Sequence, residues 1–260
     1  MLSRPGELVR QHDPDRFLTA LFAPPERRET LFALYAFNHE LARAREVARE
    51  PMAALIRLQW WREVVEGARR RHEVAGPLGE ALDAGHLHAP DLLGMIEGRE
   101  AETEPVATAE DWRAYLLAAA GGVAVAAGRA LGAGDDALVG LRRLGAAYGA
   151  AGVLRSVPAL ARQGRCMLPD AVLAAHGLTA DAVVQDPASD RLRPVLRELA
   201  ATGRESLDHG RRIPVPRAAV AAALPAALAA RDLRDPARPA RPRGFGDRAA
   251  VLLAAGRGRV

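Results

Sequence analysis

The sequence predicts an all-α protein, a single bundle of helices. Hydrophobic residues make up 49% of the 260 residues, which is ample for a large buried core, while aromatic residues are only 4%. Alanine and leucine dominate the apolar residues and β-branched residues are few. Alanine and leucine favour helices, whereas strands prefer β-branched and aromatic side chains. Apolar residues also recur at helical spacing in segment after segment, with short connections and no alternating strand pattern.

The most informative segment is 31–50, LFALYAFNHELARAREVARE, which we expect to form one helix. Pro51 marks its expected end, because a residue before proline avoids the helical conformation. The positions that share one face lie three or four residues apart, namely Leu31, Leu34, Tyr35, Asn38, Ala42, Arg45 and Arg49. This face is apolar in its first half and polar in its second. We therefore expect the polar end to line a cavity.

Helices are also expected on both sides of this segment. Residues 13–30 predict a short helix that leads through a Pro-Pro pair into the segment 31–50. Residues 52–71 carry two apolar stripes, one of them through Ile56 and Trp60. A helix that is apolar on two sides is expected to be buried between neighbours.

The remaining helices follow in order. Residues 72–90 predict loops around one short helix, and Thr108 or Asp111 is expected to cap the helix that contains the uncharged run 114–128. That run is shorter than the roughly 20 apolar residues that span a membrane, so we expect a buried helix. The other expected helices are 91–104, 135–162, 187–209, 216–231 and 248–255.

The arginines are unevenly distributed, and the chain has no lysine. Residues 231–260 hold eight arginines and three aspartates, whereas residues 1–230 hold 28 arginines and 29 acidic residues. We expect a helical domain over 1–235 and a basic Pro/Arg/Gly-rich tail over 236–260, with residues 236–247 poorly packed. The tail is either a solvated segment or one attracted to an anionic membrane face or an acidic partner. No nucleic-acid-binding module is recognisable, so we expect no nucleic acid partner.

The sequence also bears on the cellular compartment. The N-terminal residues include no apolar stretch of the kind found in secretory signal peptides, and the single Cys166 excludes an internal disulfide. The single cysteine fits a reducing compartment. We expect a cytoplasmic location, with peripheral contact to the inner membrane as an open alternative.

Three segments resemble the squalene/phytoene synthase family. ALYAF and the polar residues after it resemble the family's first signature helix, ALYAFCRxxDDxxD, and WWR at 60–62 stands in a corresponding place. Residues 144–169, LGAAYGAAGVLRSVPALARQGRCMLP, resemble the second signature, LGxAxQLTNILRDVxEDxxxGRxYLP. The resemblance covers roughly residues 15–235. It implies an isoprenoid-synthase-type bundle in which helices 31–50 and 140–158 face each other across a central cavity.

The positions that bind metal in active members of the family are altered here. Those members join two prenyl diphosphates, and aspartates on the two signature helices hold Mg²⁺ ions that neutralise the departing diphosphate. At these positions this chain has Ala42, Arg43 and Glu46 in the first signature, and Ser156 and Leu160 in the second. One glutamate cannot hold a magnesium cluster. The resemblance therefore implies no bound metal, no cofactor and no catalytic residue, with Mg²⁺ needed only if the chain is a transferase.

Two functions remain open. FNHELARAREVARE, followed by LIRLQWW, resembles more closely a divergent branch of the family that has lost the aspartates and serves respiratory complex I assembly. The first function is accordingly a non-catalytic protein that binds a protein partner or a lipid or isoprenoid ligand. The second is a Mg²⁺-dependent transferase of the phytoene or squalene synthase type.

Five residues are candidates for lining the cavity or binding a ligand: Tyr35, Asn38, Glu46, Arg155 and Arg165. Arg155 and Arg165 could bind a phosphate or acidic group, or they could make structural ion pairs, and both alternatives stay open. Pro158 is expected to disturb the helix that carries the second signature, because it lacks an N–H and clashes with the preceding turn.

Overall fold

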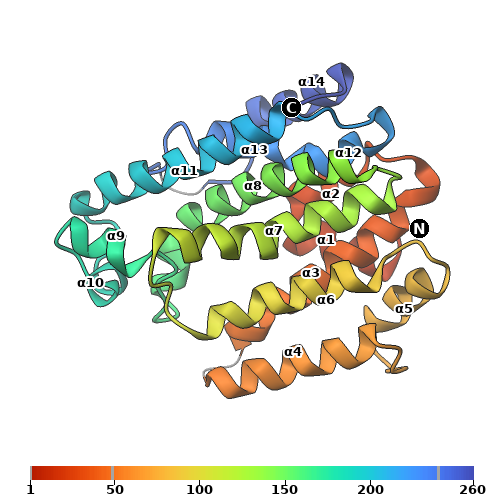
Figure 1. Ribbon diagram of the computed structural model, residues 1–260, viewed down its shortest axis with the longest axis horizontal. Coiled ribbons are helices and arrows are strands. Elements are labelled where there is room, and N and C mark those ends of the chain that lie inside the picture. The colour runs from red at the N-terminus through yellow and green to blue at the C-terminus, as the bar shows by residue number, and fades with distance from the viewer. Residues whose placement is uncertain (1, 48–49, 239–240) are drawn as a thin grey trace.

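The computed structural model describes residues 2–47, 50–238 and 241–260, which fold into one bundle of α-helices without a strand (Figure 1). The expected all-α, single-domain fold is thus confirmed. The helices are α1 (Arg4–His12), α2 (Pro14–Ala20), α3 (Arg28–Val47), α4 (Pro51–Val65), α5 (Ala75–Asp83), α6 (Ala89–Glu100), α7 (Ala109–Ala130), α8 (Asp135–Ala161), α9 (Asp170–Ala175), α10 (Ala180–Gln185), α11 (Arg193–Arg211), α12 (Val220–Ala223), α13 (Pro225–Asp232) and α14 (Phe245–Arg257). Short 3-10 turns lie at Pro25–Arg27, Ala101–Thr103, Asp190–Leu192 and Arg217–Ala219.

The long helices α7 and α8 form the centre of the bundle, with α6 packed on α7 and α11 on α8 (Figure 1). Their close approach depends on glycine. A Cβ on Gly145 would lie 2.6 Å from the carbonyl oxygen of Ala120, which is too close for any side chain. The uncharged run 114–128 forms part of α7 and is largely buried, as expected, and no described helix is long and apolar enough to cross a membrane.

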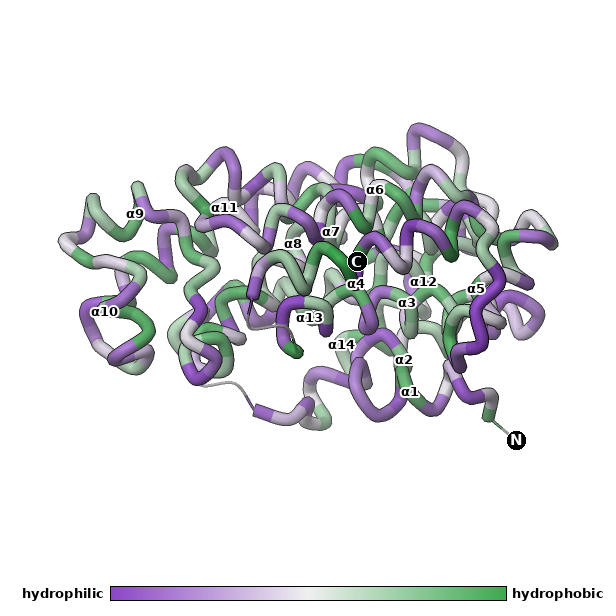
Figure 2. Tube along the Cα trace, turned by 90° about the horizontal axis from the view of Figure 1, so that it is seen from below, coloured by the Kyte–Doolittle hydropathy of each residue, from purple (hydrophilic) through white to green (hydrophobic). Residues whose placement is uncertain are grey.

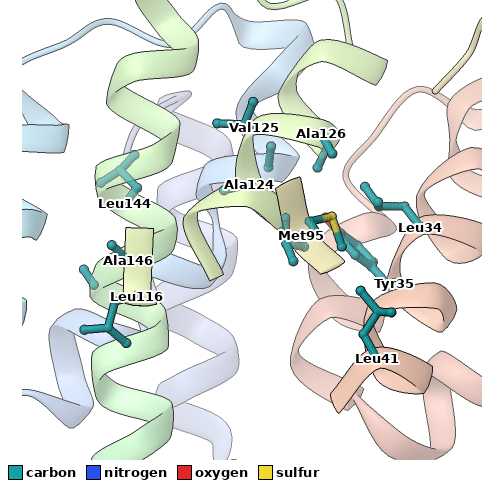
Figure 3. Packing of buried hydrophobic residues seen from close by; sticks show 14 of the residues in the cluster. Leu34, Tyr35, Leu41, Met95, Leu116, Ala124, Val125, Ala126, Leu144 and Ala146 are labelled. Carbon is teal, nitrogen blue, oxygen red and sulfur yellow. The ribbon is translucent and has the colours of Figure 1, made fainter. Parts of the chain in front are cut away.

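The core between α3, α6 and α7 is built from large apolar side chains. Figure 3 shows Met95 of α6 lying between α7 and the α3 residues Leu34 and Tyr35. All three side chains are at most 2% exposed. The two views of the molecule agree that α9 and α10 form one end of the elongated bundle, while α5 lies toward the other (Figures 1 and 2).

The expected face of α3 is confirmed over its first half, where Leu31, Leu34, Tyr35 and Asn38 are buried. The expectation for Arg49 lies outside the described residues. Pro51 has a different place from the one expected, since it begins α4 at a position that needs no backbone N–H. The short helix before α3 is α2, and a 3-10 turn follows the Pro-Pro pair.

The expectation that α4 is buried on two sides is wrong. Ile56 is 64% exposed and Met52 is 66% exposed, because α4 lies at the edge of the bundle and only its stripe through Leu58 and Trp61 faces α3 and α6 (Figure 1). Trp60 is half-buried and meets Trp61 edge-on, with ring centroids 4.8 Å apart.

Pro158 does not interrupt α8, contrary to expectation, because it lies in the last turn and removes only one hydrogen bond there. The helix continues to Ala161, and Gly164, with φ of 70°, closes the following turn. The expected helix 187–209 begins later, at Arg193, after a 3-10 turn. The short helices α9 and α10 are absent from the sequence-based expectations.

The C-terminal residues pack on the body of the protein more than expected. Val251 and Ala254 of α14 are buried against α12 and α13, in a small apolar cluster of their own. The expectation that 236–247 is poorly packed is wrong at Arg243 and Asp247, since both make buried ion pairs, although most other described residues of that segment are exposed. Residues 239–240 lie outside the described residues.

Candidate functional site

A cavity of about 210 Å³ lies at the polar end of α3. Ala42 and Glu46 of α3 line one side, and the opposite wall is the α8 stretch that includes Gly152, Ser156 and Leu160. The expectation that helices 31–50 and 140–158 face each other across a cavity is therefore confirmed. Residues from α2, α6, the turn after α6, α7 and the segment after α8 complete the lining.

The positions that correspond to the family's metal ligands lie on these facing walls. Ala42, Glu46, Ser156 and Leu160 all line the cavity. Arg43 is not part of the lining; its guanidinium forms an ion pair with the buried Glu40 at 3.0 Å. The side chains at these positions are a methyl group, one carboxylate, a hydroxyl and an isobutyl group.

This donor set does not fit Mg²⁺, which prefers several carboxylate oxygens. The carboxylates in the cavity lining are Glu46, at the exposed rim, and Glu102, whose oxygens already accept hydrogen bonds from three side chains. No group of three or more histidine, cysteine, aspartate or glutamate residues suited to a metal ion occurs within 2–47, 50–238 and 241–260.

Glu102 is the centre of a buried polar network on the cavity floor. It is 8% exposed, and its Oε1 accepts hydrogen bonds from Arg99 and from the Tyr115 hydroxyl at 2.8 Å. Its Oε2 accepts a hydrogen bond from Arg165 at 3.0 Å. Arg99 also donates to Asn38 Oδ1 at 3.2 Å. The network ties together α3, α6, α7 and the segment after α8, so it fixes the shape of the floor.

The charges in this network are mutually stabilised. Burial opposes ionisation of Glu102, but the charge and hydrogen bond of Arg99, together with Tyr115 and Arg165, outweigh it and hold the pKa of this carboxyl below its ordinary value. Burial, and then the negative charge of Glu102, raises the pKa of Tyr115 well above 10. The floor is therefore a fixed arrangement of two guanidiniums, one carboxylate and a neutral phenol at neutral pH.

A second polar cluster borders the cavity on the α2 side. The Arg16 guanidinium pairs with Asp13 at 2.8 Å and lies over the Tyr148 ring, 4.9 Å from its centroid. Tyr35 lies under the same guanidinium at 5.7 Å. The Tyr148 hydroxyl donates to Asp15 at 3.1 Å. This cluster closes the cavity toward α2 with side chains that already satisfy one another.

The structure separates the five candidate residues. Glu46 and Arg165 line the cavity. Asn38 and Tyr35 do not line it but contact residues that do: Asn38 accepts a hydrogen bond from Arg99, and the Tyr35 ring lies against the Arg16 guanidinium. Arg155 lies outside the cavity: it pairs with Asp232 at 3.2 Å and donates to the carbonyl oxygen of Arg241. Both Arg155 and Arg165 make ion pairs, as one of the two alternatives expected.

Sequence reasoning missed five residues that shape the site: Arg16, Arg99, Glu102, Tyr115 and Tyr148. Their signal in the sequence is weak, since each lies outside the aspartate positions that define the family's signatures. The run GREAETE, at the expected end of helix 91–104, contains Arg99 and Glu102. This cluster of charges is the one sequence pattern that could have indicated a polar network on the cavity floor.

A sequence profile of squalene/phytoene synthases matches residues 9–252. The chain belongs to the squalene/phytoene synthase family. Among curated proteins, complex I assembly factor 6 from human is 26% identical over 212 residues, which cover 79% of this chain and 64% of that protein. The mouse protein is 28% identical over 236 residues, which cover 88% of this chain and 70% of that protein. The chain thus spans a little under two thirds of the length of the human relative.

Solved structures of family members show the same fold. A dehydrosqualene synthase in complex with a ligand has a TM-score of 0.76 at 16% identity, and the match covers 97% of this chain and 94% of that one. Squalene synthase HpnC from Alicyclobacillus acidocaldarius has a TM-score of 0.66 at 21% identity, with coverage of 97% and 92%. The bundle is therefore of the isoprenoid-synthase type.

Proposed function

We propose that this chain is a non-catalytic member of the squalene/phytoene synthase family that binds a protein partner or a lipid in respiratory complex I assembly. The observation that carries the proposal is the cavity: the facing walls hold Ala42, Ser156 and Leu160 where active members of the family are expected to hold aspartates. Glu46 is the single carboxylate left at these positions.

The size and charge of the cavity support the same proposal. Pockets for drug-sized ligands are typically about 300–1,000 Å³, and this cavity of about 210 Å³ is smaller. It suits one side chain of a partner or one small headgroup better than two prenyl diphosphates. Its floor has a net positive charge, because Arg99 and Arg165 share the single carboxylate of Glu102, and this favours an acidic or carbonyl-bearing group.

The relatives support the assembly role. The human, mouse and Drosophila proteins that match this chain are named as complex I assembly factor 6 or its homologue. We propose a cytoplasmic location for the chain, with its basic C-terminal residues in peripheral contact with the anionic inner membrane. The concentration of arginine in residues 231–260 supports that contact.

The second candidate function is the Mg²⁺-dependent condensation of two prenyl diphosphates. Family membership and the fold shared with dehydrosqualene synthase favour it. The side chains of the cavity do not, since no carboxylate cluster faces a substrate. No step of that reaction can be derived from the residues present.

One pair of experiments separates the two functions. In the first, the purified chain is incubated with farnesyl or geranylgeranyl diphosphate and millimolar Mg²⁺, and we expect neither a condensed product nor a Mg²⁺-dependent rise in melting temperature. In the second, the gene is deleted in its own organism. We expect the amount of assembled complex I to fall and the wild-type gene to restore it. A condensed product would establish the transferase, and unchanged complex I after deletion would remove the assembly role.

A further inference from the structure

A second cavity, of about 250 Å³, lies where the segment between α13 and α14 folds back on the body of the protein. Every residue that lines it is charged. We call this cavity the arginine pocket, because six of the residues that line it are arginines: Arg155, Arg231, Arg234, Arg238, Arg241 and Arg243. It is separate from the cavity described above, because Arg155 and Ser156 are consecutive on α8 and therefore point about 100° apart.

The inner half of the arginine pocket is rigidly held. Arg243 binds Asp15 at 2.7 Å and Asp232 at 2.8 Å, and its side chain is 13% exposed. Arg231 binds Asp247 at 2.8 Å. These ion pairs connect α2, α13 and α14, so the base of the pocket is assembled before any ligand arrives.

The outer half carries unneutralised charge. Arg234, Arg238 and Arg241 are exposed at the rim, and none of them forms an ion pair with any residue that the structure describes. The lining also contains three aspartates; two of them belong to the ion pairs above, and Asp235 stands at the rim without one. Six guanidiniums line the pocket against three carboxylates, and Asp15, which binds Arg243 from behind, adds a fourth, so the site has an excess of two positive charges.

We propose that the arginine pocket binds a phosphate group, either of a phospholipid headgroup or of a free phosphate compound. Guanidinium groups offer planar pairs of donors that match phosphate oxygens, and clustered arginines in a concave site focus positive potential. Arg155 donates a hydrogen bond to the carbonyl oxygen of Arg241 at 3.3 Å, which ties Arg241 at the rim to α8. The proposal goes beyond the proposed function, since it holds whether or not the chain serves complex I assembly.

The surroundings indicate where a lipid would lie. Phe245, at the start of α14, is 89% exposed, and it lies between the pocket residues Arg243 and Asp247 in sequence. Leu252, seven residues further on the same helical face, is 57% exposed. An apolar edge beside a phosphate-binding pocket fits a phospholipid at a bilayer surface.

The test measures both sources of phosphate with the full chain. Calorimetric titration with inorganic pyrophosphate reports the soluble source, and flotation with phosphatidylcholine vesicles, with and without phosphatidic acid, reports the lipid source. The pocket variant is Arg234→Gln, Arg238→Gln and Arg241→Gln together. These side chains are exposed and form no ion pair within the part of the chain that the structure describes, so the fold is expected to stay intact. The matched control removes the same charge outside the pocket: Arg10→Gln, Arg57→Gln and Arg71→Gln, which are exposed and do not line it.

We expect pyrophosphate to bind the wild type and the control alike, and the pocket variant to bind at least tenfold more weakly. Binding to vesicles with phosphatidic acid that is lost in the pocket variant, and weakened by Phe245→Ser with Leu252→Ser, identifies the lipid source. Pyrophosphate binding without vesicle binding identifies the free source. The proposal is overturned if the wild type binds neither probe, or if the control loses as much affinity as the pocket variant.

Discussion

Replacement of Glu102 by glutamine removes the carboxylate that two guanidiniums share on the cavity floor. The glutamine keeps the volume and one acceptor oxygen, but Arg99 and Arg165 are left with no negative partner while only 16% and 12% exposed. Removal of one partner from a buried ion pair costs about 3–5 kcal/mol, because the remaining charge stays desolvated. We expect the lower end of this range, about 3 kcal/mol, since the amide oxygen still accepts a hydrogen bond.

Thermal melting followed by circular dichroism measures this cost. For a chain of this size a loss of 1 kcal/mol lowers the melting temperature by about 2–4 °C, so Glu102→Gln should melt roughly 6–12 °C below the wild type. Glu46→Gln is the matched control, because this glutamate is exposed at the rim of the same cavity and is expected to change stability by less than about 0.5 kcal/mol. Addition of Arg165→Met to Glu102→Gln should recover part of the loss, since it removes one stranded cation. A melting temperature of Glu102→Gln within about 2 °C of the wild type would refute the reasoning.

Three further predictions concern the pH dependence of Glu102, the packing of Gly145 and the ion pairs of Arg243. The pKa of Glu102 in the folded protein is depressed below its ordinary value of 4.5. The ionised carboxylate therefore stabilises the fold above pH 4.5, and this stabilisation is lost as the pH falls through the folded pKa. Urea titrations below about pH 5 should show the wild type losing stability more steeply with falling pH than Glu102→Gln, which has no carboxyl group at this position. Gly145→Ala should destabilise by about 1–3 kcal/mol in chemical unfolding, because its Cβ would meet the Ala120 carbonyl, whereas Gly152→Ala on the same helix, with nothing within 4 Å, should be neutral or stabilising. Arg243→Gln should release the segment before α14 and speed its cleavage by chymotrypsin after Phe245, and unchanged cleavage would show that the ion pairs do not hold it.

The fold was predictable because the apolar spacing and the signature segments agree with each other. The helices α3, α7 and α8 lie where the apolar pattern predicts them. Thr108, one of the two residues expected to cap α7, is its N-cap and forms a capping box with Asp111. The short helices α9 and α10 escaped prediction, because six residues are too few to show a helical period. The exposure of Ile56 could not be read from its apolar neighbours, since it depends on α4 lying at the edge of the bundle.

The site was predictable in its walls and unpredictable in its floor. The resemblance of the two signature segments to the family places Ala42 and Ser156 on facing helices, so their presence in one cavity could be expected. The contact of Arg165 with Glu102 joins residues 63 positions apart, and no local pattern encodes such a pair. For the same reason the sequence could not show that Arg155 turns away toward Asp232, 77 positions further along the chain.

The shared carboxylate of the floor has an evolutionary consequence. An aspartate gained by a single mutation at position 42 or 156 would enter a cavity whose two guanidiniums have only one negative partner between them. That first aspartate would complete the charge balance of the arginines and leave no reason for a cation to bind. The lining holds Arg16, Arg99 and Arg165 against Glu46 and Glu102, so at least two acidic mutations would be needed to give it a net negative charge. A single acidic mutation at either position is therefore not expected to restore a Mg²⁺ site in this chain.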